Sequence, residues 1–151
     1  MIYSVGHSNY DMEKFLDIVK AHGIEEIVDV RFRPYSAYVP HFNRDNLERV
    51  LKAEGIVYRF AGQFLGNDDS ISEEKFNEGI EKVMTYQKGK ALALMCSERD
   101  FKKCHRFSLI SEKILLDKSD EIHHIVSSSE VVLHSETRKK ADKTGTQINL
   151  L

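Results

Sequence analysis

The run ALALMC at residues 91–96 constrains the fold more than any other part of the chain, because it contains no polar side chain. Continuous apolar strands are typical of parallel sheets, in which helices bury both faces of a strand. Neighbouring parallel strands also need a long crossover, usually a helix, since no tight turn can join them. This run therefore predicts an α/β architecture.

The rest of the chain alternates as this architecture requires. Further short runs rich in β-forming residues lie at 2–5, 24–30, 56–60 and 121–126. Between these runs, apolar residues recur with helical spacing, as in Met12, Phe15, Leu16 and Val19. We predict a single α/β domain with a mainly parallel sheet of about five strands flanked by helices.

Two helix starts are predicted from capping residues. Asp11 precedes the first helical run and can accept an N–H group of its first turn. Ser70 and Glu73 have the spacing of a capping box before a later helical run.

The domain is expected to span residues 1–127. In the segment 128–151, the run VVLH at 131–134 predicts an edge strand, and the remainder predicts a polar C-terminal tail. A chain of 151 residues can bury one core without disulfides or a structural metal. The fold therefore does not require the two cysteines.

Charge and targeting signals limit the classes of partner. The formal net charge is -2, so there is no global attraction to nucleic acid or to an anionic membrane, and nucleic acid is not a favoured partner. The N-terminus, MIYSVGHSNY, lacks the features of a signal peptide, and no apolar run is long enough to span a bilayer. We expect a cytoplasmic protein with no membrane partner, whose two cysteines are free thiols, ligands or redox partners rather than a structural disulfide.

The strand ends indicate where a site would lie. In an open parallel sheet, ligands bind beyond the carboxyl ends of the strands, where loops and helix N-termini converge. Residues that end or follow four predicted strands would share that edge: Gly6, His7, Ser8, Asp29, Arg31, Arg33, Leu65, Gly66, Cys96 and Glu98.

The segment CSERDFKKCHR, residues 96–106, leads from this edge into the next predicted helix. Cys104, His105 and Arg106 would stand in the first helical turn. A helix N-terminus and basic neighbours lower the pKa of a thiol and favour the reactive thiolate. Either cysteine could thus serve nucleophilic or redox chemistry. The alternative, more common for an isolated pair, is that both cysteines pack as small apolar residues.

Two other readings of this segment fit less well. Cys96, Cys104 and His105, with His7 or Glu98, could ligate zinc or iron, but the spacing matches no strong zinc pattern. We therefore assign no metal ligands, and the sequence leaves the cofactor unknown. A cysteine phosphatase would need an arginine where Lys102 or Ile110 stands. An anion could still be bound by Arg31, Arg33 and Arg106.

Several residues allow two roles. His7 is either an acid/base group or a hydrogen-bonded loop residue. Asp29 is either an orienting carboxylate or one half of an ion pair with Arg31. Tyr35, Tyr38 and Phe42 either line a substrate mouth or cover the core.

Short motifs occur in a characteristic order: GHSN, DVR, RPYS, HFN, GIVYRF, FLG, CSE and CHR. Over roughly residues 2–126 this set resembles the bacterial and archaeal family catalogued as domain of unknown function 488, for which no activity is established. The resemblance implies the motif positions His7, Ser8, Asp29, Arg31, Pro34, Ser36, Cys96, Glu98, Cys104, His105 and Arg106. The chain departs from the usual pattern at Ala37, where a basic residue is usual, and at Asn67, where a second glycine is usual.

The leading functional hypothesis is an enzyme that acts on an anionic small molecule or nucleotide-like substrate. Cys96 or Cys104 would supply the thiolate, while Glu98 and His7 or His105 would be acid/base groups and Asp29 an orienting carboxylate. Substrate would be bound by Ser8, Arg31, Arg33, Ser36 and Arg106. The alternative is a non-catalytic module that binds phosphate, a nucleotide or nucleic acid, in which the cysteines only pack.

Overall fold

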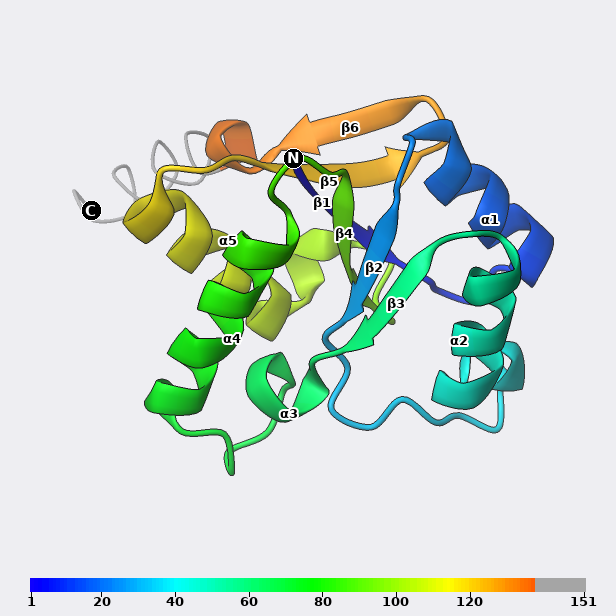
Figure 1. Cartoon of the computed structure of the whole chain (residues 1–151), viewed down its shortest axis with the longest axis horizontal. Coiled ribbons are helices and arrows are strands. Elements are labelled where there is room, and N and C mark those ends of the chain that lie inside the picture. The colour runs from blue at the N-terminus through cyan, green and yellow to red at the C-terminus, as the bar shows by residue number, and fades with distance from the viewer. Residues whose placement is uncertain (138–151) are drawn as a thin grey trace, which may run out of the picture.

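The computed structural model describes residues 1–137, with the backbone alone for His105 and Arg106. Six strands form one sheet in the order β3-β2-β4-β1-β5-β6 (Figure 1). The strands are β1 (Ile2–Gly6), β2 (Glu26–Asp29), β3 (Val57–Phe60), β4 (Leu92–Cys96), β5 (Ile122–Ser127) and β6 (Glu130–Leu133). The first five are parallel, and β6 pairs antiparallel with β5. This confirms the predicted α/β fold, with one strand more than the count we expected.

The apolar run that suggested the architecture forms β4, near the middle of the sheet. All five residues of β4 are buried, and the strand lies between β1 and β2. Leu92 is opposite Ile2 on one side and opposite Glu26 on the other. The extra strand, β6, lies at the sheet edge in the segment where the sequence predicts an edge strand. Most of the predicted polar tail lies outside the described residues.

Helices cover both faces of the sheet (Figure 1). One face carries α1 (Met12–Ala21), the 3-10 turn η1 (Pro40–Phe42) and α2 (Arg44–Ala53); the other carries α3 (Gly62–Leu65), α4 (Glu73–Tyr86), η2 (Phe101–Lys103) and α5 (His105–Lys118). Phe15 and Leu47 pack in the first layer, and Ile80 and Ile110 pack in the second. No helix within residues 1–137 has the length and apolar character needed to cross a membrane.

One predicted helix cap is confirmed and one is wrong. Asp11 caps α1, accepting the backbone N–H of Lys14 at 2.7 Å. The N-cap of α4 is Ser72, not Ser70, and it accepts from Lys75 at 3.1 Å. The helix begins only at Glu73, and the hydroxyl of Ser70 instead donates to Asp68, two residues earlier.

The connections leaving β1 and β4 create a crevice at the carboxyl ends of these neighbouring strands. The chain leaves β1 for α1 on one face and leaves β4 for α5 on the other, which is the arrangement that opens a binding crevice in α/β sheets. The two loops touch through their backbones: the N–H of His7 donates to the carbonyl of Cys96 at 2.9 Å. A Cβ atom on Gly6 would lie 1.9 Å from the carbonyl oxygen of Glu98, so only glycine allows this close approach.

Candidate functional site

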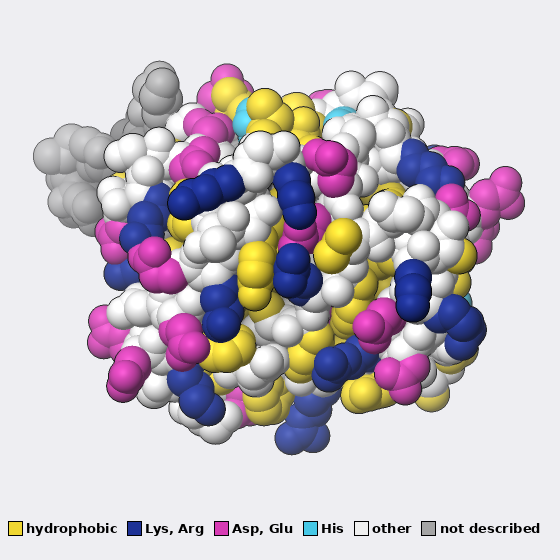
Figure 2. Space-filling view, viewed as in Figure 1, with side chains coloured by type: hydrophobic (Ala, Val, Ile, Leu, Met, Phe, Trp, Pro, Cys, Tyr) yellow, Lys and Arg dark blue, Asp and Glu magenta, His cyan; other side chains and the backbone are white. Residues whose placement is uncertain are grey.

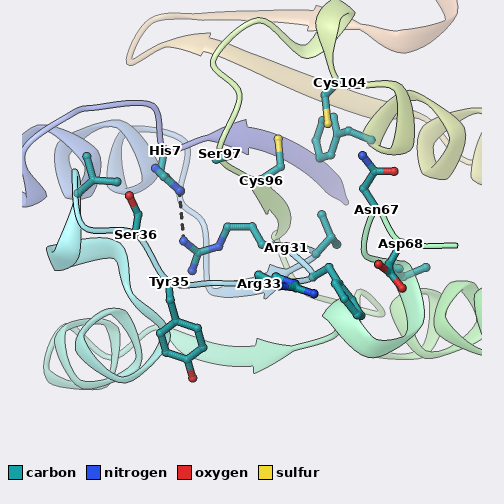
Figure 3. A pocket seen from close by; sticks show the side chains of 15 residues that line it. His7, Arg31, Arg33, Tyr35, Ser36, Asn67, Asp68, Cys96, Ser97 and Cys104 are labelled. Atoms are coloured by element: carbon teal, nitrogen blue, oxygen red, sulfur yellow. Dashed lines mark hydrogen bonds between the residues drawn. The ribbon is translucent and has the colours of Figure 1, made fainter. Parts of the chain in front are cut away.

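A pocket of about 650 Å³ opens at the carboxyl ends of β1, β2 and β4 (Figure 3). It collects side chains from loops that are far apart in the sequence. The lining includes His7 after β1, Arg31, Arg33, Tyr35 and Ser36 after β2, Asn67 and Asp68 after α3, and Cys96, Ser97 and Cys104 from the end of β4 to the start of α5.

Arg31 is fixed by a buried carboxylate. Its Nε and Nη2 donate to the two carboxylate oxygens of Asp29, each at 2.8 Å, and its backbone N–H donates to Oδ1 at 3.1 Å. The hydroxyl of Tyr58 donates to the same carboxylate at 2.6 Å. Asp29 is fully buried, and the side chain of Arg31 is only 10% exposed. Of the two readings of Asp29, the structure therefore shows the ion pair, and Asp29 lies behind Arg31 rather than on the pocket wall.

His7 binds the third nitrogen of the same guanidinium. Its Nδ1 lies 2.7 Å from the carbonyl oxygen of Ser8, and its Nε2 lies 3.2 Å from Nη1 of Arg31. Because a carbonyl oxygen can only accept, Nδ1 carries the proton and Nε2 accepts from Arg31. Burial lowers the pKa of His7 to about 4, so the ring is neutral at pH 7. The ring also stacks on Phe42, with centroids 4.5 Å apart.

The two cysteines are free thiols on one wall of the pocket. Cys96 ends β4 and is buried, with its Sγ 3.6 Å from the carbonyl oxygen of Glu98. Cys104 is half-buried and is the N-cap residue of α5. Cys104 packs against the core cluster to which Cys96 belongs, and Figure 3 shows both side chains on the same side of the pocket.

The interaction between the two thiols gives them different pKa values. The hydrogen bond with Cys96 is the main reason that the pKa of Cys104 is lowered to about 7, and the backbone N–H of Phe107 acts in the same direction. The same hydrogen bond, together with burial, raises the pKa of Cys96. The arrangement therefore contains one thiol that ionises near neutral pH and one that stays protonated.

The mouth of the pocket is polar and partly aromatic. Arg33 is exposed there, and Tyr35 is 63% exposed. The loop that carries these residues is braced at Ser36, whose backbone N–H donates to Asn43 Oδ1 at 2.7 Å. The Ser36 hydroxyl accepts from the backbone N–H of Tyr38 at 3.1 Å. Tyr38 itself is 96% exposed and does not line the pocket, whereas Phe42 is fully buried in the core.

Other residues predicted for the site lie beside it or outside the described part. The side chain of Glu98 is exposed and accepts from the backbone N–H of Asp100 at 3.2 Å. The hydroxyl of Ser8 donates to Asn9 at 3.3 Å, away from the pocket lining. The side chains of His105 and Arg106 lie outside the described residues, so the roles predicted for them stay predictions.

Sequence reasoning did not select Tyr58, Ser97 or Asp68 for the site. Tyr58 contacts Asp29 because β2 and β3 are neighbours with Ile27 opposite Tyr58, a register that depends on strand order. Ser97 directly follows the strand-end residue Cys96, so the strand-end rule could have included it. Within the described part of the chain, no group of three histidine, cysteine, aspartate or glutamate side chains has a geometry that would hold a metal ion.

The fold and pocket define an α/β protein with a crevice at the strand ends. The sequence profile of the family described as domain of unknown function DUF488 matches residues 11–73 and 67–112, and the chain belongs to this family. The matched segments carry Asp29, Arg31, Cys96 and Cys104. Comparisons with the curated proteins and with solved structures gave no match.

Proposed function

We propose that the pocket is the active site of an enzyme that acts on an anionic, nucleotide-like small molecule, with Cys104 as the nucleophile. The observation that carries this proposal is the position of Cys104. Its sulfur lies at the start of a 14-residue helix, beside a second thiol and in a pocket that Arg31 and Arg33 also line. Helix N-termini and hydrogen-bond donors are the usual means by which proteins generate a reactive thiolate.

The pocket offers an anion oriented hydrogen-bond donors and an aromatic ring as well as positive charge. Arg31 is held at three nitrogens by Asp29 and His7, so the remaining N–H bonds of its guanidinium have a fixed direction. Asp29 offsets the positive charge of Arg31, which leaves Arg33 and the helix N-terminus to supply the net attraction. Tyr35 provides an exposed ring at the mouth on which a nucleobase can stack.

A small anion suits this surface better than a long nucleic acid. On the face shown in Figure 2, lysine and arginine side chains alternate with acidic ones rather than forming a continuous basic stripe. Nucleic-acid backbones bind through many phosphate contacts along such a stripe. The pocket therefore favours a ligand that is bound at one place.

The second candidate is a non-catalytic module that binds the same class of ligand. The hydrogen bond between His7 and Arg31 favours this module. His7 is neutral and already accepts a hydrogen bond from Arg31, so it positions the arginine and is not a base ready for proton transfer. The two functions differ in the role of Cys104. An enzyme needs this thiol for turnover, whereas a binding module needs it for neither turnover nor ligand binding.

Calorimetric titration with phosphate, sulfate and mononucleotides, under reducing conditions, tests the proposal. The wild type should bind a mononucleotide more tightly than phosphate. Arg33→Ala should weaken binding about tenfold or more, as expected for loss of a charge-assisted hydrogen bond. Arg49→Ala removes an exposed arginine from α2 and serves as the matched control.

The role of Cys104 requires a chemical readout. Incubation with candidate nucleotides should give turnover or a covalent adduct in the wild type, and neither in Cys104→Ser, which should still bind the ligand. Binding without chemistry in either protein would support the module instead. Absence of binding by the wild type would contradict both functions.

A further inference from the structure

The two cysteines of the chain meet although the loop 97–103 separates them in sequence. Both line the same pocket, and Figure 3 shows their side chains on the same side of it. They differ in access: the buried Cys96 ends a central strand, while the half-buried Cys104 begins a helix. Cys104 also packs against the core cluster to which Cys96 belongs.

We propose that Cys104 and Cys96 form a two-electron redox site that reduces a low-molecular-weight disulfide, with Cys104 as the attacking thiol and Cys96 as the resolving thiol. This goes beyond the proposed function, because it assigns the same nucleophile a redox reaction with a disulfide instead of turnover of a nucleotide-like substrate.

The chemistry balances with the small disulfide as oxidant. The Cys104 thiolate attacks one sulfur of the disulfide, forming a mixed disulfide and releasing one thiolate of the substrate. Cys96 then gives its proton to a leaving thiolate and attacks the sulfur of Cys104. This step forms the Cys96–Cys104 bond and releases the second substrate sulfur as a thiolate, which takes from solvent the proton that Cys104 had lost on ionising. The protein is oxidised by two electrons, and one disulfide becomes two thiols.

The surroundings assign the two roles. Attack requires a thiolate near ambient pH that solvent can reach, which describes Cys104. The resolving thiol should be inaccessible to bulky disulfides but adjacent to the attacking sulfur, which describes Cys96. Its strand end is held by the backbone hydrogen bond from His7, which fixes the position of Cys96.

Formation of the intramolecular disulfide would also consume the nucleophile of the proposed enzyme. Activity at the pocket would therefore fall under oxidising conditions and return when a dithiol reductant regenerates the two thiols. The redox reaction is measured by mass and thiol content, whereas the proposed function is measured by ligand binding and turnover in reduced protein. Failure of one can thus be distinguished from failure of the other.

The experiment treats the reduced full chain with oxidised glutathione and follows intact mass. The wild type should lose the mass of two hydrogen atoms and retain no glutathione, and a dithiol reductant should reverse the change. Cys96→Ser should accumulate a stable glutathione adduct on Cys104, because no resolving thiol is present. Cys104→Ser should react at least tenfold more slowly than the wild type.

Two further measurements keep the result decisive. Cys96→Ala replaces Cys96→Ser if the serine variant unfolds, and circular dichroism checks the fold of each protein. A wild type that keeps a glutathione adduct, or that does not react while both thiols are titrated by a small alkylating agent after denaturation, would overturn the proposal. Equal rates for Cys104→Ser and the wild type would overturn the assignment of the attacking thiol.

Discussion

Nη1 of Arg31 lies 3.2 Å from Nε2 of His7, so a neutral imidazole accepts a hydrogen bond from a guanidinium. The opposite side of that guanidinium is bound to both oxygens of Asp29. The arginine is therefore oriented from two sides before any ligand arrives. Such preorganisation reduces the ordering cost of binding, because the side chain has already lost its rotamer freedom.

Replacing Arg31 should test how much the fold depends on this arrangement. Arg31→Ala leaves the fully buried carboxylate of Asp29 without its cation, and removing one partner of a buried ion pair costs about 3–5 kcal/mol. We expect a loss of that size in the free energy of unfolding from urea denaturation. Arg33→Ala, at an exposed position nearby, should change it by about 0.5 kcal/mol or less. If both substitutions lowered the free energy of unfolding by the same small amount, the buried carboxylate of Asp29 would not need the charge of Arg31 for stability.

The buried histidines should make the fold sensitive to acid. Burial lowers the pKa of His7 to about 4 and that of His124 to about 3, against an ordinary value of 6.5. His124 lies in a buried chain in which its Nε2 is 2.9 Å from Nδ1 of His134, whose Nε2 is 2.9 Å from Glu112. Other charges that act on His124 are those of His123 and Glu121.

Between pH 6.5 and pH 4 the unfolded chain binds more protons at these two histidines than the native chain does. The free energy of unfolding should therefore fall as the pH falls through this window, approaching about 1.4 kcal/mol per pH unit for each histidine. Urea titrations at several pH values measure the slope. His7→Gln should have a shallower slope than the wild type, whatever its absolute stability. Parallel curves for the two proteins would contradict a neutral His7 in the native state.

The sequence was sufficient to predict the strands and the edge of the sheet where the site lies. The strand-end rule placed His7, Arg31 and Cys96 together because each follows or ends a parallel strand, whatever the order of the strands. It could not predict that Tyr58 binds Asp29, since this contact depends on β3 being the neighbour of β2 and on their register.

The sequence also left two alternatives open that only side-chain geometry could separate. The spacing of Asp29 and Arg31 is compatible with either an orienting carboxylate or an ion pair, and the rotamer of Arg31 decides between them. Likewise, the separation of Cys96 and Cys104 along the chain does not specify that the loop returns one thiol to the other. The missed cap at Ser72 has a local cause, because the hydroxyl of Ser70 binds Asp68 and the helix begins only at Glu73.

The rate of Cys104 alkylation by iodoacetamide, measured against pH with and without a saturating mononucleotide, tests the central claim most directly. Peptide mapping assigns the label, and Cys96→Ala shows how far the neighbouring thiol supports the thiolate. We predict a midpoint near pH 7 for the wild type, a higher midpoint for Cys96→Ala, and slower labelling when the nucleotide occupies the pocket. A midpoint at or above about 8.5, the pKa of an ordinary cysteine, together with labelling that the nucleotide does not slow, would contradict a nucleophilic Cys104 in an anion-binding site.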